Sequence, residues 1–180
     1  SDIEILVVDD GSPGNTEPLL RQCTGMDDRV RVIKLRTNVG TYQARNVAFD
    51  AATGDYITFL DSDDWSHPRR LERQVRPLLA DTSLVATTSR ALKVTEKLEL
   101  TQLGLSPFTL GPASLMFRKD PVLKRIGYLH GIRRAADNEY LRRILAVFGD
   151  RSYLRVSPKE QRQLALYRQR PGSLSRPDSH

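Results

Sequence analysis

Short apolar segments alternate with segments of helical periodicity along most of this chain, and this alternation restricts the fold more than any other feature. Apolar and β-branched side chains predict strands at residues 3–8, 30–35, 56–60, 84–88 and 113–117. Helical spacing and end signals predict helices at residues 17–23, 41–52, 69–80, 120–126 and 137–148. Strands that alternate with helices are typical of an α/β fold with a mostly parallel sheet and helices on both faces. In such folds the loops at the carboxyl ends of the strands carry the ligands.

Two regions have no clear pattern. Residues 90–112 mix Thr, Lys, Glu and Leu without a period and contain several Gly and Pro residues, so a flexible loop is expected there. The chain is polar from residue 157 onward, and residues 171–180 are expected to form a flexible tail. No internal repeat is visible, and residues 1–180 are interpreted as one domain.

The composition limits the classes of partner. Of the 180 residues, 39% are hydrophobic and 28% are charged, which is typical of one ordinary globular domain. An excess of 28 Lys and Arg over 22 Asp and Glu gives a net charge of +6 and favours anionic partners. The aromatic residues are not interleaved with basic clusters, as they are in a nucleic-acid groove, so no nucleic acid partner is expected.

The single cysteine and the hydropathy bear on the location of the chain. Cys23 alone cannot form an internal disulfide and favours a reducing compartment, so a cytoplasmic location is expected. The sequence has no apolar run of about 18 residues and predicts no membrane-spanning helix. Because anionic lipid headgroups also attract a basic chain, association with the inner face of a membrane is the alternative.

Three acidic residues follow the strand predicted at residues 56–60. Asp61 and Asp63 are two positions apart on a turn, where their carboxylates can face one hard cation such as Mg²⁺ or Mn²⁺. Together with Asp64 they also repel one another, which costs stability unless a cation offsets the charge. Acidic residues after a strand are as often loop caps or salt-bridge partners, so the motif alone does not define a metal site.

Five short motifs resemble one known family in both order and spacing: 9–12 (DDGS), 38–40 (NVG), 44–46 (ARN), 54–57 (GDYI) and 59–64 (FLDSDD). They are similar to the motifs of family-two glycosyltransferases. The resemblance continues through Gly127-Tyr128, residues 136–139, Arg143, Tyr167-Arg168 and residues 171–175, and so spans nearly the whole chain.

The resemblance implies a GT-A fold, the Rossmann-like fold of nucleotide-diphospho-sugar transferases. It implies that a sugar moves from a nucleoside diphosphate to an acceptor hydroxyl with inversion, in polysaccharide or glycoconjugate synthesis. The donor is expected to be a UDP-sugar, the acceptor a carbohydrate or glycoconjugate, and the cofactor Mn²⁺ or Mg²⁺ on the diphosphate.

Several residues of the expected donor site are assigned by this resemblance. Asp10, or its neighbour Asp9, matches the position that hydrogen-bonds the base, although either carboxylate can instead cap a turn. Arg45 lies where a guanidinium can meet phosphate oxygens, or is simply solvated. Asp61 matches the acid near the ribose and Asp63 the metal-binding acid, and Asp63 is favoured as the direct ligand.

The expected general base is Asp137, the carboxylate that takes the proton of the acceptor hydroxyl. The alternative is that Asp137 and Glu139 only stabilise the amino-terminal end of their helix.

The chain departs from the family pattern in two places. The family opens with an apolar strand and a loop that lies against the nucleoside, whereas this chain begins at the following strand. An upstream strand before Ser1 is therefore expected, and the chain without it is expected to have little activity. Many relatives carry a histidine near the carboxyl end where this chain has Arg170, and that cation is expected to neutralise phosphate of the donor.

Three other functions compete with this interpretation. A phosphotransferase of the haloacid dehalogenase type also uses Asp-x-Asp after a strand, but Asp64-Trp65 stands where such enzymes have Thr or Val. A nucleotide-binding module that keeps the fold without transfer is the main alternative, because the first strand is missing. A nucleic-acid-binding protein is supported only by the net charge.

Overall fold

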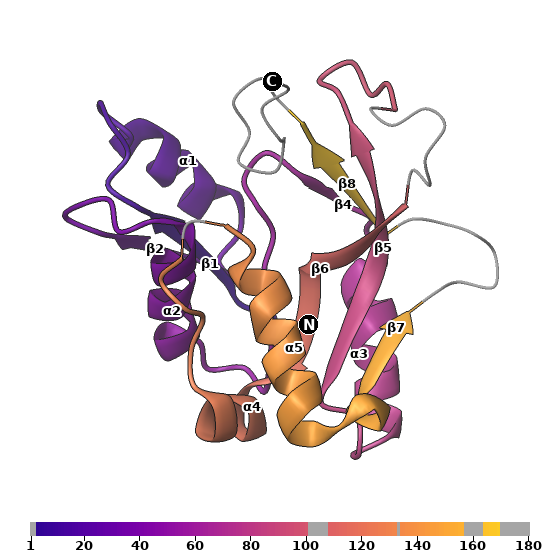
Figure 1. Ribbon diagram of the computed structural model, residues 1–180. Coiled ribbons are helices and arrows are strands. Elements are labelled where there is room, and N and C mark those ends of the chain that lie inside the picture. The colour runs from indigo at the N-terminus through magenta and orange to yellow at the C-terminus, as the bar shows by residue number, and fades with distance from the viewer. Residues whose placement is uncertain (1–2, 101–107, 133, 157–163, 170–180) are drawn as a thin grey trace.

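The computed structural model describes residues 3–100, 108–132, 134–156 and 164–169, which form two sheets flanked by helices (Figure 1). The expected tail at residues 171–180 and Arg170 lie outside the described residues, as do residues 101–107 of the expected loop. None of the helices in the described part is long and apolar enough to cross a membrane.

The first sheet has two parallel strands, β1 (Ile5–Asp9) and β2 (Val30–Lys34), with Ile5 opposite Val30. Parallel strands need a crossover, and helix α1 (Glu17–Met26) provides it and packs on β2. Helix α2 (Thr41–Ala51) packs on β1. Both strands and both helices lie within a few residues of their predicted bounds.

The second sheet has six strands in the order β3-β6-β5-β8-β4, with β7 paired to β5. Their bounds are β3 Tyr56–Thr58, β4 Trp65–Ser66, β5 Ala86–Val94, β6 Phe108–Arg118, β7 Tyr153–Val156 and β8 Ala165–Arg168. The α/β class is confirmed, but this sheet is mixed and the expectation of a mostly parallel sheet was wrong. Strand β6 runs antiparallel to both β3 and β5, and β8 runs antiparallel to β4.

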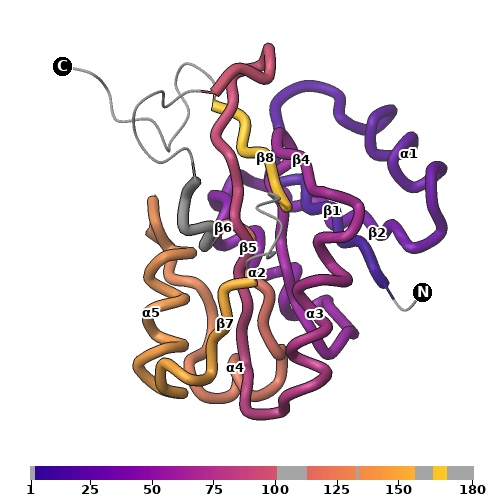
Figure 2. The backbone as a smooth tube through the Cα atoms, turned by 90° about the vertical axis from the view of Figure 1, so that its right-hand side faces the viewer, coloured from indigo at the N-terminus to yellow at the C-terminus, as the bar shows by residue number. Residues whose placement is uncertain are grey.

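Helices cover both faces of the second sheet, as predicted (Figure 2). Helix α3 (Arg70–Ala80) lies on one face, and α4 (Lys119–Ile126) and α5 (Ala136–Phe148) lie on the other. A short 3₁₀ turn, η1 (Asp150–Ser152), leads from α5 into β7. The core between α5 and the sheet is built on edge-on and tilted aromatic rings, chiefly Phe49, Phe117 and Tyr140. This core ties α2, α5 and the sheet together.

The central strand β5 extends into the region expected to be a loop. Residues 90–94 belong to β5 and residues 108–112 to β6, so the loop expectation was wrong for both segments. Thr87, Thr88 and Ser89 are at most 1% exposed, and partners distant in sequence bind the hydroxyls of the two threonines and the backbone of Ser89. The Thr88 hydroxyl lies 2.6 Å from that of Tyr153, and the Ser89 N–H donates to Ser114 Oγ at 2.8 Å. Such a strand lacks the apolar signature on which prediction from sequence depends.

One edge of β1 and one edge of β3 have no strand partner among the described residues. Strand β1 pairs only with β2, and β3 only with β6. The starts of the two strands are close, because Glu4 Oε1 accepts the N–H groups of Thr53 and Gly54 at 2.6 and 2.8 Å. Ile5 remains 39% exposed although it begins an apolar strand. The strand expected upstream of Ser1 would pair with these edges, and it stays a prediction.

A chain extended by an apolar strand ahead of Ser1 is therefore expected to unfold at a higher temperature than residues 1–180, because the free backbone groups of the edges would be paired. Thermal unfolding followed by circular dichroism measures the difference. An extension of equal length in which the apolar residues are replaced by serine is the control. Equal melting temperatures for all three chains would contradict the prediction.

Candidate functional site

Strand β1 ends at Asp9, and Asp10 follows it. Both side chains hold the loops at the carboxyl end of this strand. Asp9 accepts the Ser12 N–H at 3.0 Å and the Thr16 hydroxyl at 2.8 Å, and these hydrogen bonds from Ser12 and Thr16 lower its pKa. Asp10 accepts the N–H groups of Val39 and Gly40 at 2.7 and 2.8 Å. Both carboxylates therefore cap backbone N–H groups, the alternative raised by the sequence, and contact with a base remains a proposal.

The two loops after β1 and β2 also touch through backbone. A Cβ on Gly11, which has a φ of +62°, would lie 2.7 Å from the N atom of Asn38. Asn38 in turn donates its side-chain amide to the Asp10 carbonyl at 3.0 Å. Glycine at position 11 is thus required both by its left-handed backbone and by this close approach. These contacts hold the two loops together at the carboxyl end of the first sheet.

Arg45 joins helix α2 to the acidic turn after β3. Its side chain is only 12% exposed, so it is not merely a solvated arginine. The guanidinium lies 4.1 Å from the centre of the Phe59 ring and forms an ion pair with Asp61 Oδ1. It also lies 5.5 Å from the Tyr42 ring. The structure therefore brings together two of the residues assigned to the donor site, Arg45 and Asp61.

One acid of the acidic turn, Asp64, is perturbed by burial and by the charges of its neighbours. Burial, followed by the charges of Asp61 and Asp63, raises the pKa of Asp64 to about 7. Asp64 Oδ1 accepts the backbone N–H of Arg168 at 2.8 Å, which fixes the turn to β8. Trp65 follows and is 45% exposed, so it is not a core residue.

The donor set of this turn fits Mg²⁺ or Mn²⁺ better than a cation that needs a closed protein cage. The described residues contain no group of three or more His, Cys, Asp or Glu side chains that could hold a metal ion. Mg²⁺ normally takes one or two carboxylates and completes its shell with water and substrate phosphate oxygens. The ion pair with Arg45 occupies one oxygen of Asp61, so Asp61 has fewer oxygens to offer a cation.

Asp137 lies in the first turn of α5, facing α2. Its Oδ1 atom accepts the N–H of Asn138 at 3.0 Å and lies 3.5 Å from the hydroxyl of Tyr42. Tyr42 also contacts Arg45, so a single side chain links the expected base to the Arg45 and Asp61 pair. Glu139, in contrast, pairs with Arg143 at 2.5 Å. Of the two acids in this turn, Asp137 is therefore the one that faces the site.

Tyr42 was not singled out in the sequence as a site residue. Its signal is faint: an aromatic residue three positions before Arg45, on the same face of the same helix. Asp64 was noted only as a neighbour of the acidic pair, although burial and its charged neighbours raise its pKa to about 7. Neither property depends on local sequence alone.

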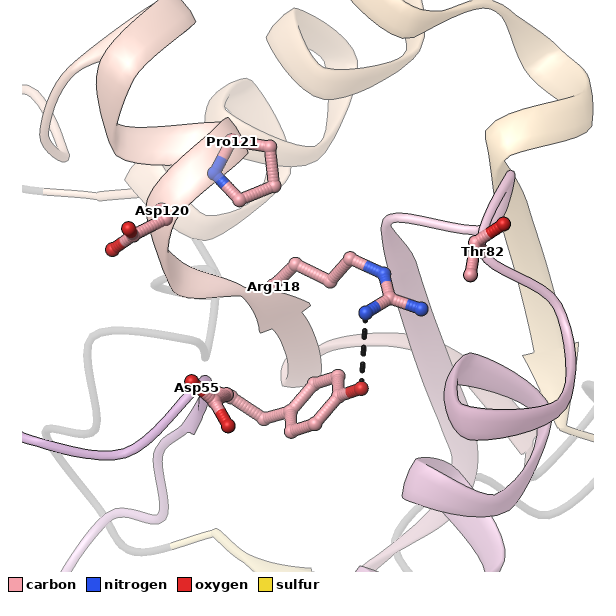
Figure 3. Close-up of a pocket in the computed structure, with 6 residues that line it drawn as sticks. Asp55, Thr82, Arg118, Asp120 and Pro121 are labelled. Carbon is pink, nitrogen blue, oxygen red and sulfur yellow. Dashed lines mark hydrogen bonds between the residues drawn. The ribbon is translucent and has the colours of Figure 1, made fainter.

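A hollow of about 330 Å³ lies at the other end of β3, away from this site. Its lining comprises Asp55, Tyr56, Thr82, Arg118, Asp120 and Pro121 (Figure 3). The Arg118 guanidinium donates to the Leu84 carbonyl at 2.8 Å, to the Tyr56 hydroxyl at 3.0 Å and to the Leu78 carbonyl. Because these protein groups use its donors, the hollow has no free cation for an anionic ligand. We assign it no function.

Replacing Asp64 with Asn is expected to stabilise the metal-free protein at pH 8. A pKa of about 7 in the folded state, above that of the unfolded chain, means that the stabilising effect of the protonated carboxyl is complete below about pH 4 and lost as the pH rises through 7. Asn keeps an acceptor for the Arg168 N–H and removes the charge. After a discount for partial exposure we expect a gain of about 2 kcal/mol, or roughly 4–8 °C in melting temperature.

Differential scanning calorimetry in EDTA between pH 4 and pH 8 measures this effect, and the gain should vanish toward pH 4. Asp28→Asn, at an exposed position before β2, is the control and should show no such trend. A constant difference between Asp64→Asn and the parent at every pH would contradict the prediction.

The geometry described above defines a class of protein: a mixed α/β domain with carboxylates at the carboxyl ends of β1 and β3 and a half-buried arginine paired with one of them. S. aureus TarS in complex with UDP-GlcNAc has the same fold, with a TM-score of 0.67 and 21% identity over 94% of this chain and 50% of that one. The mannosyltransferase PcManGT from Pyrobaculum calidifontis, in complex with GDP-Man and Mn²⁺, has a TM-score of 0.64 and 18% identity over 92% and 47% of the two chains. The fold is GT-A.

The chain belongs to glycosyl transferase family 2, whose model matches residues 1–141. It is 34% identical over 153 residues to the succinoglycan biosynthesis protein ExoO of Rhizobium meliloti, an alignment that covers 78% of this chain and 42% of ExoO. It is 36% identical over 89 residues to the putative teichuronic acid biosynthesis glycosyltransferase TuaG of Bacillus subtilis, covering 49% and 35% of the two chains. The chain thus spans less than half the length of these relatives.

Proposed function

We propose that this chain is the donor-binding part of a glycosyltransferase that moves a sugar from a nucleoside diphosphate to an acceptor hydroxyl with inversion. The observation that carries the proposal is that Asp61, Arg45 and Asp137, which are far apart in sequence, are linked in space. Arg45 forms an ion pair with Asp61, and Tyr42 contacts both Arg45 and Asp137. Membership of the family supports it.

In the proposed reaction the acceptor oxygen bonds to the anomeric carbon from the face opposite the diphosphate. The bond from that carbon to the diphosphate oxygen breaks, and the diphosphate leaves with the electron pair. Asp137 takes the proton of the acceptor hydroxyl, as a general base within hydrogen-bond reach would. Among the described residues only Oδ1 of Asp137 is engaged, so Oδ2 is available for this proton.

The donor side of the site must bind a nucleotide and offset the charge of its leaving diphosphate. We assign Asp63, with Asp61 as a second acid, to hold Mn²⁺ or Mg²⁺, which supplies positive charge to the diphosphate. Arg45 fixes Asp61 and adds a cation near the phosphates. Asp9 or Asp10 would contact the base, and Arg170 would neutralise phosphate from the carboxyl end of the chain.

The donor and the biological role are part of the same proposal. TarS binds UDP-GlcNAc and PcManGT binds GDP-Man, and the sequence resemblance favours a UDP-sugar here. The names of ExoO and TuaG support a role in polysaccharide synthesis, with a carbohydrate or glycoconjugate acceptor. We place this activity in the cytoplasm, with the inner face of a membrane as the alternative location.

A thermal-shift panel of UDP, GDP and dTDP, each with Mn²⁺, with Mg²⁺ and with EDTA, tests donor binding, because a ligand of the folded state raises its melting temperature. A metal-dependent shift for one nucleotide is expected. Release of that nucleotide from its sugar donor then separates an enzyme from a binding module. No shift with any nucleotide would reject the proposal, and binding without release would favour the module.

A further inference from the structure

We propose that Tyr42 is a positioning residue that holds the Asp137 carboxylate at a fixed place relative to the ion pair of Arg45 and Asp61. This inference rests on the proposed function, since it assigns Tyr42 to the base of the proposed transfer. No motif of the sequence points to Tyr42, and the proposal comes from three contacts of one side chain.

The first contact fixes the ring. Tyr42 and Arg45 are three residues apart on α2 and so share one face of the helix. The guanidinium of Arg45 contacts the rings of both Tyr42 and Phe59, 5.5 and 4.1 Å from their centres. The ion pair with Asp61 also holds Arg45, so the phenol ring lies next to a guanidinium that is itself tethered.

The other two contacts place the hydroxyl at the start of α5. It lies 3.5 Å from Asp137 Oδ1, and the main chain of Ala136 is within hydrogen-bonding reach. Burial and the negative charge of Asp137 raise the pKa of Tyr42, so the hydroxyl keeps its proton at neutral pH and can donate it. With Oδ1 held by Tyr42 and the Asn138 N–H, the carboxylate presents Oδ2 to an acceptor.

The start of α5 needs such support from outside. The residue before the helix, Ala135, has a φ of +62°, a left-handed conformation that a residue with a Cβ adopts only at a cost. Its side chain cannot cap the helix, and no side-chain cap is formed at this end. Within α5 the Asp137 side chain accepts only from the Asn138 N–H among the described residues, and Tyr42 reaches the same oxygen from α2.

Helix α2 also anchors the segment that leads into α5. Asn46 exchanges two hydrogen bonds with the backbone of Leu129, donating at 2.8 Å and accepting at 3.0 Å. Nearer the end of α2, Asp50 accepts the hydroxyl of Tyr128. These contacts fix the path of the segment but not the Asp137 side chain. They make Tyr128→Phe a matched control, because it also removes one tyrosine hydroxyl between the same two parts of the chain.

The experiment compares Tyr42→Phe with the parent, using nucleotide release from the donor that the panel selects and UDP-GlcNAc as the first probe. Phe keeps the ring against Arg45 and loses the hydroxyl. We expect kcat to fall about tenfold, the size of a lost hydrogen bond to a charged group, with donor affinity by calorimetry unchanged. Tyr42→Leu also loses the ring and should weaken donor binding, whereas Tyr128→Phe should match the parent.

A double-mutant cycle separates positioning from general destabilisation. If Tyr42 acts through Asp137, Tyr42→Phe should have no further effect on kcat in an Asp137→Asn background. An equal fall in both backgrounds, or a loss of donor affinity in Tyr42→Phe, would overturn the inference. If Asp137→Asn alone left kcat unchanged, the proposed base would fail instead, so the two failures are distinguishable.

Discussion

Replacing Asp63 with Ala is expected to remove the dependence of nucleotide binding on Mn²⁺ or Mg²⁺. In the parent we expect UDP to bind at least about a hundredfold more tightly with Mn²⁺ than with EDTA, a difference that corresponds to roughly 2.7 kcal/mol. Burial, together with the charges of Asp61 and Asp63, raises the pKa of Asp64 to about 7, and a cation would offset the repulsion among the three acids. Isothermal titration calorimetry with and without metal measures the effect.

A matched control comes from the opposite end of β3, the strand that leads into the acidic turn. Asp55 immediately precedes β3 and is exposed, so Asp55→Ala removes one carboxylate without touching the acidic turn. It should keep the full metal dependence of the parent. Equal affinity of the parent for UDP in Mn²⁺ and in EDTA would falsify the metal role, whatever the behaviour of the variants.

The second large effect is expected from Asp137→Asn, which should keep donor binding and lower transfer by roughly a hundredfold or more, as for the loss of a general base. Asn can still accept the N–H of Asn138 and the hydroxyl of Tyr42, so the geometry of the turn is preserved. Donor affinity, measured by calorimetry, should therefore stay unchanged while turnover, measured by nucleotide release, falls. Turnover should be measured in the longest chain that carries this domain.

Glu139→Gln tests the alternative base in the same turn. Glu139 pairs with Arg143 at 2.5 Å and lies 3.7 Å from His130, so its removal should cost stability more than turnover. A normal rate for Asp137→Asn together with a slow Glu139→Gln would transfer the role of base to Glu139.

The local pattern of the sequence is sufficient for the elements that surround the donor side of the site. The apolar runs before Asp9 and Asp61 and the helical spacing after Thr41 predict β1, β3 and α2 within a few residues. The acids that follow those strands lie at the carboxyl ends of the strands simply by their position in the sequence. These features depend on residues that are neighbours in sequence, so sequence alone determines them.

The rest of the fold and of the site depends on contacts that no local pattern records. Strand β5 buries Thr87, Thr88 and Ser89, and Gln74, Tyr153 and Ser114 accept or share hydrogen bonds with the threonine hydroxyls and the Ser89 N–H from other segments. Tyr42 meets Asp137 across a separation of 95 residues, and Arg45 meets Asp61 across 16. The sequence by itself determined the family, the α/β class and the acids at the strand ends. Only the tertiary structure decided the mixed sheet and which side chains meet, because burial of polar groups is favourable only when specific distant partners are in place.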